Sequence, residues 1–281
     1  MDIQTSPGGN KLRESVREHY AAAAQNVTSG KAASCCGTTG DPRAIAAYDP
    51  DAIGDLPRDA VLASLGCGNP TALAELLPGE TVLDLGSGGG IDVLLSAKRV
   101  GPEGFVYGLD MTDEMLALAE HNRQEAGIDN VRFLKGTIEE IPLPENSVDV
   151  IISNCVINLS GDKDAVLREA HRVLRPGGRF AVADIVLQGR LIPAVRHSLD
   201  AWSACISGAL TETEYQQKLG AAGFIDVGIE VTSVHELAEL MTDGCCDATE
   251  GSGCCEGSLD VTALQDLQDA SGRVISAFVR A

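Results

Sequence analysis

The sequence is poor in basic and aromatic residues, and it has no long hydrophobic run. Lysine and arginine number 21 against 41 aspartate and glutamate, so the formal net charge is −20. Phosphate backbones are bound through lysine and arginine, and this balance therefore disfavours nucleic acid as a partner. No apolar stretch approaches the roughly 20 residues of a membrane helix, so we expect no membrane partner. With 4% aromatic residues, the core must be mainly aliphatic.

Cysteine, by contrast, is abundant, with nine residues in a chain of 281. The N-terminus has neither the basic start nor the apolar core of a signal peptide. We therefore expect a cytoplasmic protein. Its thiols should be reduced, because disulfides are rare in the cytosol. Some cysteines stand alone, while others form adjacent pairs. The segment 243–258 carries two such pairs in a polar, glycine-rich stretch, which predicts a flexible loop.

Short apolar strands alternate with amphipathic helices between residues 81 and 187. Strands are predicted over 81–86, 105–110, 131–136, 148–154 and 179–187, and helices over 89–99, 113–126 and 162–174. This alternation predicts an α/β fold with a parallel sheet, right-handed crossovers and helices on both faces. The flanking parts are predicted as a disordered start (1–10), a helix (11–24), a long connection (25–60), a helix near 212–222 and strands near 224–234 and 275–281.

A glycine-rich loop, Asp84-Leu-Gly86-Ser-Gly88-Gly89-Gly90, follows the first predicted strand and opens a helix. Glycines in such a turn let the backbone approach a ligand held near the helix N-terminus. A dinucleotide fingerprint would need glycine where Ile91 stands, and it would not place an acid ahead of its first glycine. The acid instead suits a ligand that has an ammonium group in place of a pyrophosphate. Asp110, which ends the next strand, is placed to accept hydrogen bonds from both hydroxyls of a ribose.

These residues resemble those of the Rossmann-like S-adenosylmethionine-dependent methyltransferases, over about residues 80–187. The resemblance implies a class I fold, with a doubly wound and mostly parallel sheet, and S-adenosyl-L-methionine as methyl donor. It also implies that the glycine loop contacts the amino-acid part of the cofactor, that the acid after the second strand holds the ribose, and that residues after the third strand flank the adenine. The cofactor-binding residues are then Asp84, Gly86, Gly88, Asp110, Met111, Thr137, Ile138 and Glu139, together with Asn154 at the end of the fourth strand.

The three isolated cysteines occupy suggestive positions. Cys67 lies between two glycines ahead of the first strand, Cys155 directly follows the fourth strand, and Cys205 lies after the fifth. Ligands of open α/β sheets bind outside the carboxyl ends of the strands, so Cys155 should face the reactive end of the cofactor. Each cysteine could instead be a small buried hydrophobe, as free cysteines often are. Thiolates bind soft centres. The positions of these cysteines at strand ends and beside glycines therefore favour a thiophilic substrate.

The stretches 63–76, 153–163 and 205–210 are similar to those of the arsenite methyltransferases, a likeness that covers about residues 12–235 and the final strand. The resemblance implies that three cysteines bind trivalent arsenic and that a fourth takes part in thiol–disulfide turnover. The first three correspond to Cys67, Cys155 and Cys205, and the fourth corresponds to Cys35 or Cys36. The substrate is then arsenite as a thiol adduct, for example with glutathione, and a reductant such as thioredoxin or glutathione restores the enzyme.

The methyl transfer that this resemblance implies needs no general base, and the sequence offers none at the expected strand. Arsenic(III) held by three thiolates keeps a lone pair that can attack a sulfonium methyl in line, and no proton has to be removed. A general base is therefore not required, which agrees with the absence of histidine and lysine from the strand at 148–154. The enzyme's task is then mostly to position the two reactants.

We expect three regions in this chain. Residues 1–60 form an N-terminal helix and a cysteine-bearing extension, 61–190 the cofactor-binding domain, and 191–281 a substrate-covering region with the cysteine-rich loop and the last strands. The loop cysteines do not have the C-x-x-C spacing typical of zinc sites. We expect the loop to capture arsenic(III) or another soft ion before delivery, and the alternative is a variable acidic loop without a catalytic role. Its cysteines are Cys245, Cys246, Cys254 and Cys255.

Two other functions stay open at this point. A C- or O-methyltransferase of a small molecule such as a quinone would need apolar pocket residues, whereas the segment 190–215 supplies cysteine, serine and polar groups. A non-catalytic protein that binds arsenic(III) or a soft metal would have no need of a cofactor site, yet the glycine loop and Asp110 are intact.

Overall fold

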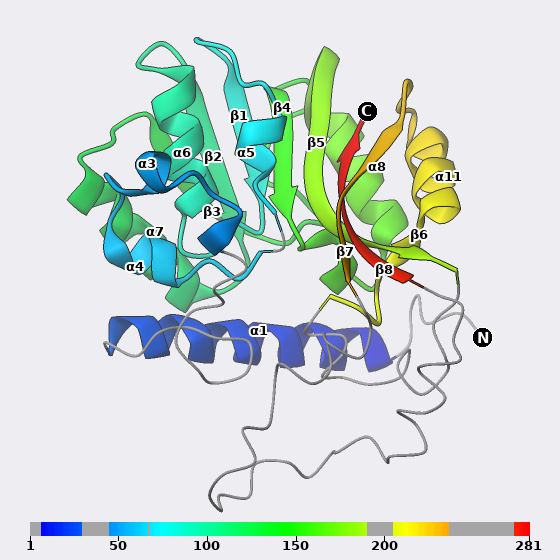
Figure 1. The fold of residues 1–281 in the computed structure, drawn as a ribbon, viewed down its shortest axis with the longest axis horizontal. Coiled ribbons are helices and arrows are strands. Elements are labelled where there is room, and N and C mark those ends of the chain that lie inside the picture. Colours follow the sequence, from blue (N-terminus) through cyan, green and yellow to red (C-terminus); the bar gives the residue numbers. More distant parts are fainter. Residues whose placement is uncertain (1–6, 30–44, 67, 190–204, 236–272) are drawn as a thin grey trace, which may run out of the picture.

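The computed structural model of the protein describes residues 7–29, 45–66, 68–189, 205–235 and 273–281. In this part of the chain an eight-stranded sheet has the order β3-β2-β1-β4-β5-β8-β7, and β6 pairs with β5 (Figure 1). The strands are β1 (Thr81–Leu85), β2 (Phe105–Asp110), β3 (Val131–Lys135), β4 (Val148–Asn154), β5 (Leu174–Gln188), β6 (Leu210–Thr211), β7 (Gly228–His235) and β8 (Arg273–Arg280).

Helices flank this sheet, and one long helix lies across its lower edge in Figure 1. The helices are α1 (Pro7–Thr28), α3 (Pro50–Ile53), α4 (Arg58–Leu62), α5 (Pro70–Leu73), α6 (Ile91–Val100), α7 (Asp113–Ala126), the 3-10 helix η1 (Ile157–Leu159), α8 (Lys163–Val173) and α11 (Glu212–Ala222). No helix in the described ranges is both long enough and apolar enough to cross a membrane.

The pairing of the strands confirms the predicted Rossmann-like sheet. β1 pairs in parallel with β2 and β4, β2 pairs in parallel with β3, and β4 pairs in parallel with β5. Their carboxyl ends therefore meet at one edge, which is where ligands bind in open α/β sheets. β8 runs antiparallel to both β5 and β7 and so extends the sheet beyond its parallel part.

The two faces of the sheet are covered by different helices, because side chains alternate along each strand. In β1, Leu83 and Leu85 pack into the cluster that includes the buried residues of α8 and α11. Val82 packs on the opposite face with Val93 and Val100 of α6. All three β1 side chains are fully buried, and burial of each contributes about 1.5–3 kcal/mol. These two aliphatic layers hold the carboxyl ends of the strands in place.

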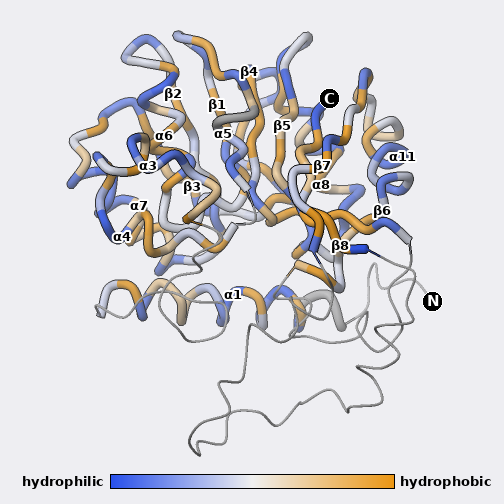
Figure 2. Tube along the Cα trace, viewed as in Figure 1, coloured by the Kyte–Doolittle hydropathy of each residue, from blue (hydrophilic) through white to orange (hydrophobic). Residues whose placement is uncertain are grey.

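The first helix is longer than the sequence analysis predicts. A disordered start over 1–10 and a helix over 11–24 were expected, whereas α1 begins at Pro7 and continues to Thr28. A proline at the first helical position is favourable because its missing N–H needs no partner there. The end of the helix is set by packing, since Ala24 and Val27 are buried against Met115 and Leu118 of α7. Figure 2 shows hydrophobic and hydrophilic residues alternating along α1, as expected for a helix with one packed face.

The fifth parallel strand also begins earlier than predicted. Residues 174–178 were expected to be the end of a helix and a turn, but β5 starts at Leu174. Its pairing with β4 changes register, from Val148 opposite Leu174 to Val150 opposite Arg179, so Pro176 and its neighbours form an irregularity within the strand. Proline cannot donate a ladder hydrogen bond, and it is tolerated at such bulges. The turn residues were thus recognised correctly, but they interrupt a strand and do not precede one.

Candidate functional site

The glycine-rich loop connects β1 to α6, as predicted. The backbone N–H groups of Gly86 and Ser87 both donate to the carbonyl oxygen of Leu109, at 2.8 and 2.9 Å, and so tie the loop to β2. Gly86 has a φ of 74°, and a Cβ at this position would lie 2.5 Å from the methyl groups of Val156. Only glycine avoids both the left-handed strain and this collision. The loop is therefore held close to Val156, the residue that follows Cys155.

Asp84 is the buried acid at the start of this loop. It is 2% exposed, and its Oδ1 atom has no hydrogen-bond partner among the described residues. Burial raises the pKa of its carboxyl well above the usual value, and the nearby carboxylates of Asp92 and Asp110 raise it further. An ammonium group would supply both the missing donor and the missing positive charge. The structure thus fits the prediction that Asp84 receives the amino-acid part of S-adenosylmethionine.

Asp110 lies at the end of β2 and ties the glycine loop to the next segment. Its Oδ2 accepts a hydrogen bond from the N–H of Gly88 at 3.0 Å, and its Oδ1 accepts one from the N–H of Thr112 at 2.8 Å. Burial raises the pKa of Asp110, while these backbone donors oppose the shift. Each carboxylate oxygen can accept a further hydrogen bond, so the position remains able to bind ribose hydroxyls. Met111 follows directly.

The segment predicted to flank the adenine follows β3. Ile138 in this segment is buried, and Thr137 forms an isolated bridge with Glu140. Glu139 accepts a hydrogen bond from the hydroxyl of Ser160 at 2.6 Å. It also lies 3.8 Å from the guanidinium of Arg13, so it connects this segment to α1. Figure 1 shows α1 lying across the same edge of the sheet at which β4 ends.

Cys155 and Cys205 are brought together at this edge. The thiol of Cys205 donates to the carbonyl oxygen of Cys155 at 2.9 Å, and both side chains are buried. The N–H of Cys155 donates to the carbonyl oxygen of Ala183 in β5, which fixes Cys155 between the ends of β4 and β5. The structure thus brings together two of the three cysteines that the resemblance implies for arsenic binding, and their role in binding stays a prediction.

The oxidation state of Cys155 differs from the expectation of reduced thiols. Cys205 is not disulfide-bonded, whereas Cys155 is disulfide-bonded. The other cysteines predicted to act in binding or turnover lie outside the described ranges. They are Cys35, Cys36, Cys67, Cys245, Cys246, Cys254 and Cys255.

Asn154, predicted to bind the cofactor, has its side chain in a buried polar network. Its Nδ2 donates to the carbonyl oxygen of Gly68 at 2.7 Å, to the hydroxyl oxygen of Tyr48 at 3.2 Å and to Asp92 at 3.4 Å. Tyr48 in turn donates to the Asp92 carboxylate at 3.0 Å. Burial raises the pKa of Asp92 to about 6. The sequence analysis missed both Tyr48 and Asp92. Asp92 lies in the first turn of α6, where an acid is common because it interacts favourably with the helix dipole.

A second buried network, around Asp184, was also missed. Asp184 in β5 accepts hydrogen bonds from Tyr215 at 3.0 Å and from Asn158 at 2.7 Å. Burial raises the pKa of Asp184 to about 7. Burial likewise lowers the pKa of Lys163 to about 8, although Asp184 and Cys205 oppose that shift through their charges. In the sequence, Asp184 is a single acid in an otherwise apolar strand, which was the only available signal.

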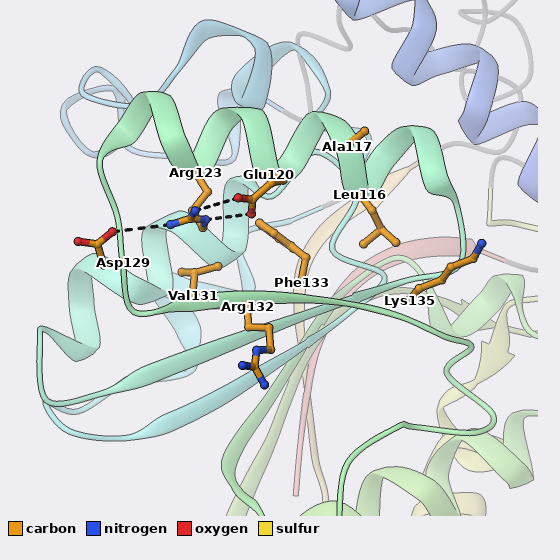
Figure 3. Close-up of a pocket in the computed structure, with 9 residues that line it drawn as sticks. All are labelled: Leu116, Ala117, Glu120, Arg123, Asp129, Val131, Arg132, Phe133 and Lys135. Atoms are coloured by element: carbon orange, nitrogen blue, oxygen red, sulfur yellow. Dashed lines mark hydrogen bonds and ion pairs between the residues drawn. The ribbon is translucent and has the colours of Figure 1, made fainter.

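A pocket of about 600 Å³ lies elsewhere, between α7 and the edge strand β3 (Figure 3). Figure 3 shows Arg123 between Glu120 and Asp129, with which its guanidinium forms ion pairs of 2.8 and 3.8 Å. The charge of this arginine is therefore already balanced within the pocket. None of the predicted site residues lines it, so it is separate from the site described above. Its lining is Leu116, Ala117, Glu120, Arg123, Asp129, Val131, Arg132, Phe133 and Lys135.

Comparison with known proteins places this geometry in a family. The family described as "Methyltransferase domain" matches residues 76–247. An arsenite methyltransferase of Halobacterium salinarum is 40% identical over 249 residues, and one of Aquipseudomonas alcaligenes is 37% identical over 222 residues. The matches cover 83% and 76% of this chain, and the chain spans 62% of the length of each relative.

A solved structure agrees with these relatives. The crystal structure of an arsenic(III) S-adenosylmethionine methyltransferase from Chlamydomonas reinhardtii superimposes with a TM-score of 0.65 and is 32% identical. The match covers 86% of this chain and 74% of that one. In both sequence and fold, the chain belongs to the arsenite S-adenosylmethionine methyltransferase family.

Proposed function

We propose that the protein transfers a methyl group from S-adenosylmethionine to trivalent arsenic bound by cysteine thiolates, and so takes part in arsenic detoxification. The observation that carries the proposal is the meeting of Cys155 and Cys205 beside the glycine loop. The Cys205 thiol reaches the backbone of Cys155, and the next residue, Val156, packs against Gly86. A soft substrate at these sulfurs would therefore lie next to the cofactor-binding loop.

The residues of the cofactor site suit S-adenosylmethionine, which supplies an electrophilic methyl group on a sulfonium. Asp84 would bind its ammonium group through the oxygen that has no other partner among the described residues. Asp110 would accept hydrogen bonds from the ribose, and Gly86 and Gly88 would leave room for the amino-acid part. Thr137, Ile138 and Glu139 would flank the adenine. This set would bind the cofactor beside the end of β4.

The substrate arsenic would be bound by the thiolates of Cys155 and Cys205, with Cys67 as the third ligand. These cysteines would hold the arsenic with its lone pair toward the electrophilic methyl group that bound S-adenosylmethionine would supply for transfer. No proton is transferred in this step, so positioning accounts for most of the catalysis. Methyl transfer would raise arsenic from oxidation state III to V. Attack of the Cys35 or Cys36 thiolate on one arsenic-bound sulfur would form a disulfide and leave the As–S electron pair on arsenic, which returns it to state III. Each methyl added would thus replace one thiolate bond, and later rounds of methylation would need fewer cysteines.

Turnover would require a thiol reductant. Cys155 must be reduced before it can bind arsenic, whereas its sulfur is oxidised in the structure. We therefore infer that glutathione or thioredoxin restores the binding form, with Cys35 or Cys36 as the exchanging thiol. Arsenite would arrive as a thiol adduct, and the cysteine pairs of the segment 243–258 would capture it before delivery.

The decisive experiment is incubation of the reduced protein with arsenite, S-adenosylmethionine and glutathione, followed by arsenic speciation of the solution and the headspace. Methylated arsenic that depends on S-adenosylmethionine is the expected product. A parallel incubation with a demethylated quinone tests the alternative substrate class. Methylation of the quinone alone would contradict the proposal. Arsenite binding without any methyl transfer would indicate a sensor.

A further inference from the structure

Cys155 and Cys205 lie beside the part of β5 that extends beyond the end of β4. Asn154, the last residue of β4, pairs with Ala183, whereas β5 continues to Gln188. The N–H of Cys155 donates to the carbonyl oxygen of Ala183 at 2.8 Å. The thiol of Cys205 in turn donates to the carbonyl oxygen of Cys155 at 2.9 Å. The relative position of the two cysteines therefore depends on this end of β5.

Asp184, the next residue of β5, joins the two segments that carry these cysteines. Its Oδ1 accepts a hydrogen bond at 2.7 Å from Nδ2 of Asn158, which lies in η1, just after Cys155 in the chain. Its Oδ2 accepts one at 3.0 Å from the hydroxyl of Tyr215, which lies in α11, the helix that follows Cys205. One carboxyl group therefore links both segments to the same residue of β5.

The chain between Cys205 and Tyr215 is held along its length, so a bond at Tyr215 also restrains Cys205. The N–H of Ala209 closes a turn by donating to the carbonyl oxygen of Ile206 at 3.1 Å, and the next residues form β6, which pairs with β5. Thr211 then begins α11 with a capping box. A shift of α11 away from β5 would therefore move the segment that carries the Cys205 thiol.

The side chains that meet at Asp184 are shielded from water. Asp184 is 1% exposed, and Asn158 and Tyr215 are 0% exposed. Nδ2 of Asn158 also donates to the carbonyl oxygen of Ile185 at 2.7 Å, and the N–H of Ile185 donates to Asp184 Oδ1 at 3.0 Å. A buried donor that loses its partner is costly. Without the carboxyl group, the two segments are therefore expected to shift toward other partners.

Lys163 shows that this carboxyl group and the Cys205 thiol share one electrostatic environment. Its Nζ donates to the carbonyl oxygens of Asn158 at 3.3 Å and Ser160 at 2.9 Å. Burial lowers the pKa of Lys163, and the negative charges of Asp184 and Cys205 both oppose that shift. A single ammonium group thus interacts with both, which agrees with a direct coupling between the Asp184 contacts and the cysteine pair.

We propose that Asp184 is a positioning residue of the arsenic-binding site, whose side chain holds the segments of Cys155 and Cys205 together so that both sulfurs can bind one arsenic atom. The choice of arsenic as the shared atom rests on the proposed function, whereas the link between the two segments does not. Asp184 acts through Asn158 and Tyr215, so its loss should weaken binding by the thiol pair and leave the cofactor site intact.

The test uses the full-length protein in a parent variant whose only cysteines are Cys155 and Cys205, reduced before use, with every other cysteine replaced by serine. Phenylarsenous acid is the probe, because it has two exchangeable ligands and binds two close thiols more tightly than one. We expect Asp184→Ala to raise its Kd at least about 10-fold, because the second thiol loses effective concentration. Calorimetric titration measures the Kd. The Kd of S-adenosylmethionine should stay unchanged.

The conservative substitution Asp184→Asn should restore binding. Its amide oxygen can accept from Asn158 and its amide nitrogen can donate to the oxygen of Tyr215, so the Kd of phenylarsenous acid should stay within about 2-fold of the parent. Tyr215→Phe removes only the link to the Cys205 segment and should raise this Kd by about 3-fold. Because it removes a single hydroxyl group, Tyr215→Phe keeps the test valid if Asp184→Ala does not fold.

Asn130→Ala is the matched control for a general loss of stability. The Asn130 amide also holds backbone carbonyls, those of Gly101 and Gly104, but it lies just before β3, at the opposite edge of the sheet. This variant should lower the free energy of unfolding without changing the Kd of phenylarsenous acid. An unchanged Kd in both Asp184→Ala and Tyr215→Phe, or an equal loss of arsenical and S-adenosylmethionine affinity in both, would overturn the assignment of Asp184.

A single-thiol reference separates this inference from the proposed function. Adding Cys205→Ser to the parent variant gives the affinity of one thiol for phenylarsenous acid. If the parent bound no more tightly than this reference, the two sulfurs would not share an atom and the inference would be wrong. If the expected pattern of Kd values appears but the wild-type protein forms no methylated arsenic from arsenite and S-adenosylmethionine, only the proposed reaction is wrong.

Discussion

The thiol of Cys205 lies 2.9 Å from the carbonyl oxygen of Cys155, although 50 residues separate the two in the chain. Each of these cysteines has a φ of 62°, in the left-handed region that non-glycine residues rarely adopt. Such conformations cost about 1–3 kcal/mol each and are retained where the surroundings enforce them. Strain at both members of a contacting pair supports a functional role for this contact and argues against simple burial of two small side chains.

Replacement of Cys205 by serine tests the thiolate site directly. Serine preserves the size and the hydrogen-bonding ability of the side chain, but its oxygen is a poor ligand for a soft centre. We expect Cys205→Ser to reduce arsenite methylation to background while S-adenosylmethionine affinity is unchanged. Arsenic speciation and calorimetric titration of the cofactor measure the two effects. Rates like those of the wild type in the double variant Cys155→Ser/Cys205→Ser would exclude binding by three thiolates.

Asp84→Asn tests the cofactor site. Because a hydrogen bond to a charged group contributes about 1.5–3 kcal/mol, the Kd of S-adenosylmethionine should rise by about 10- to 100-fold. The free energy of unfolding should rise, because burial disfavours the Asp84 carboxylate in the free protein. Chemical denaturation and calorimetry measure both. The control Asp149→Asn disrupts an ion pair with Arg175 at the start of β4 and should have no effect on cofactor affinity. Equal affinities of Asp84→Asn and the wild type would contradict the assignment.

Gly86→Ala should destabilise the fold more than Gly101→Ala does. Both glycines have a left-handed φ, of 74° and 68°, but only at Gly86 would the new Cβ meet another side chain. The collision with Val156 should add about 1–3 kcal/mol to the loss in unfolding free energy. In a Val156→Gly background, which also removes the Val156 Cβ that would lie 2.9 Å from the new Cβ, the two substitutions should cost nearly the same. Urea denaturation checks the difference, and equal costs in the wild-type background would show that the loop can move away from Val156.

The buried carboxyl of Asp184 should make stability depend on pH. Its pKa is about 7 in the folded protein against an ordinary value of 3.8, so the folded state holds a proton that the unfolded chain has released between these values. The contribution of Asp184 to stability therefore falls as pH rises from about 4 to about 7, by at most about 4 kcal/mol. Relative to Asp184→Asn, the wild type should lose unfolding free energy over this range. Parallel curves from urea denaturation at several pH values would contradict the shift.

The sequence analysis predicted the parallel part of the sheet and the cofactor loop because their signals are local. The apolar strand before Asp84, the glycines after it and the acid at the end of the next strand all lie within one short segment. The limits of the elements were predicted less well. α1 is extended by packing against α7, and Pro176 interrupts β5 where a turn was expected. In both cases contacts between distant segments determine where the element begins or ends.

The polar networks could not be predicted in the same way. Tyr48, Asp92 and Asn154 come from three separate segments, and each has an ordinary local explanation. Only the fold shows that they meet beside Gly68. Asp184 is similar, since its partners Asn158 and Tyr215 are reached through η1 and α11. The position of Cys155 at a strand end was predictable, whereas its contact with Cys205 depends on a segment whose path the sequence does not specify.

The place of β8 in the sheet has a consequence for synthesis of the protein. This strand, residues 273–280, is inserted between β5 and β7, and Ala281 exchanges two backbone hydrogen bonds with Phe180 in β5. While the chain is still on the ribosome, β5 therefore has an unpaired edge until its final partner emerges from the exit tunnel. Exposed strand edges promote association with other chains. Nascent or truncated chains that lack these residues are thus the form of the protein most in need of a chaperone.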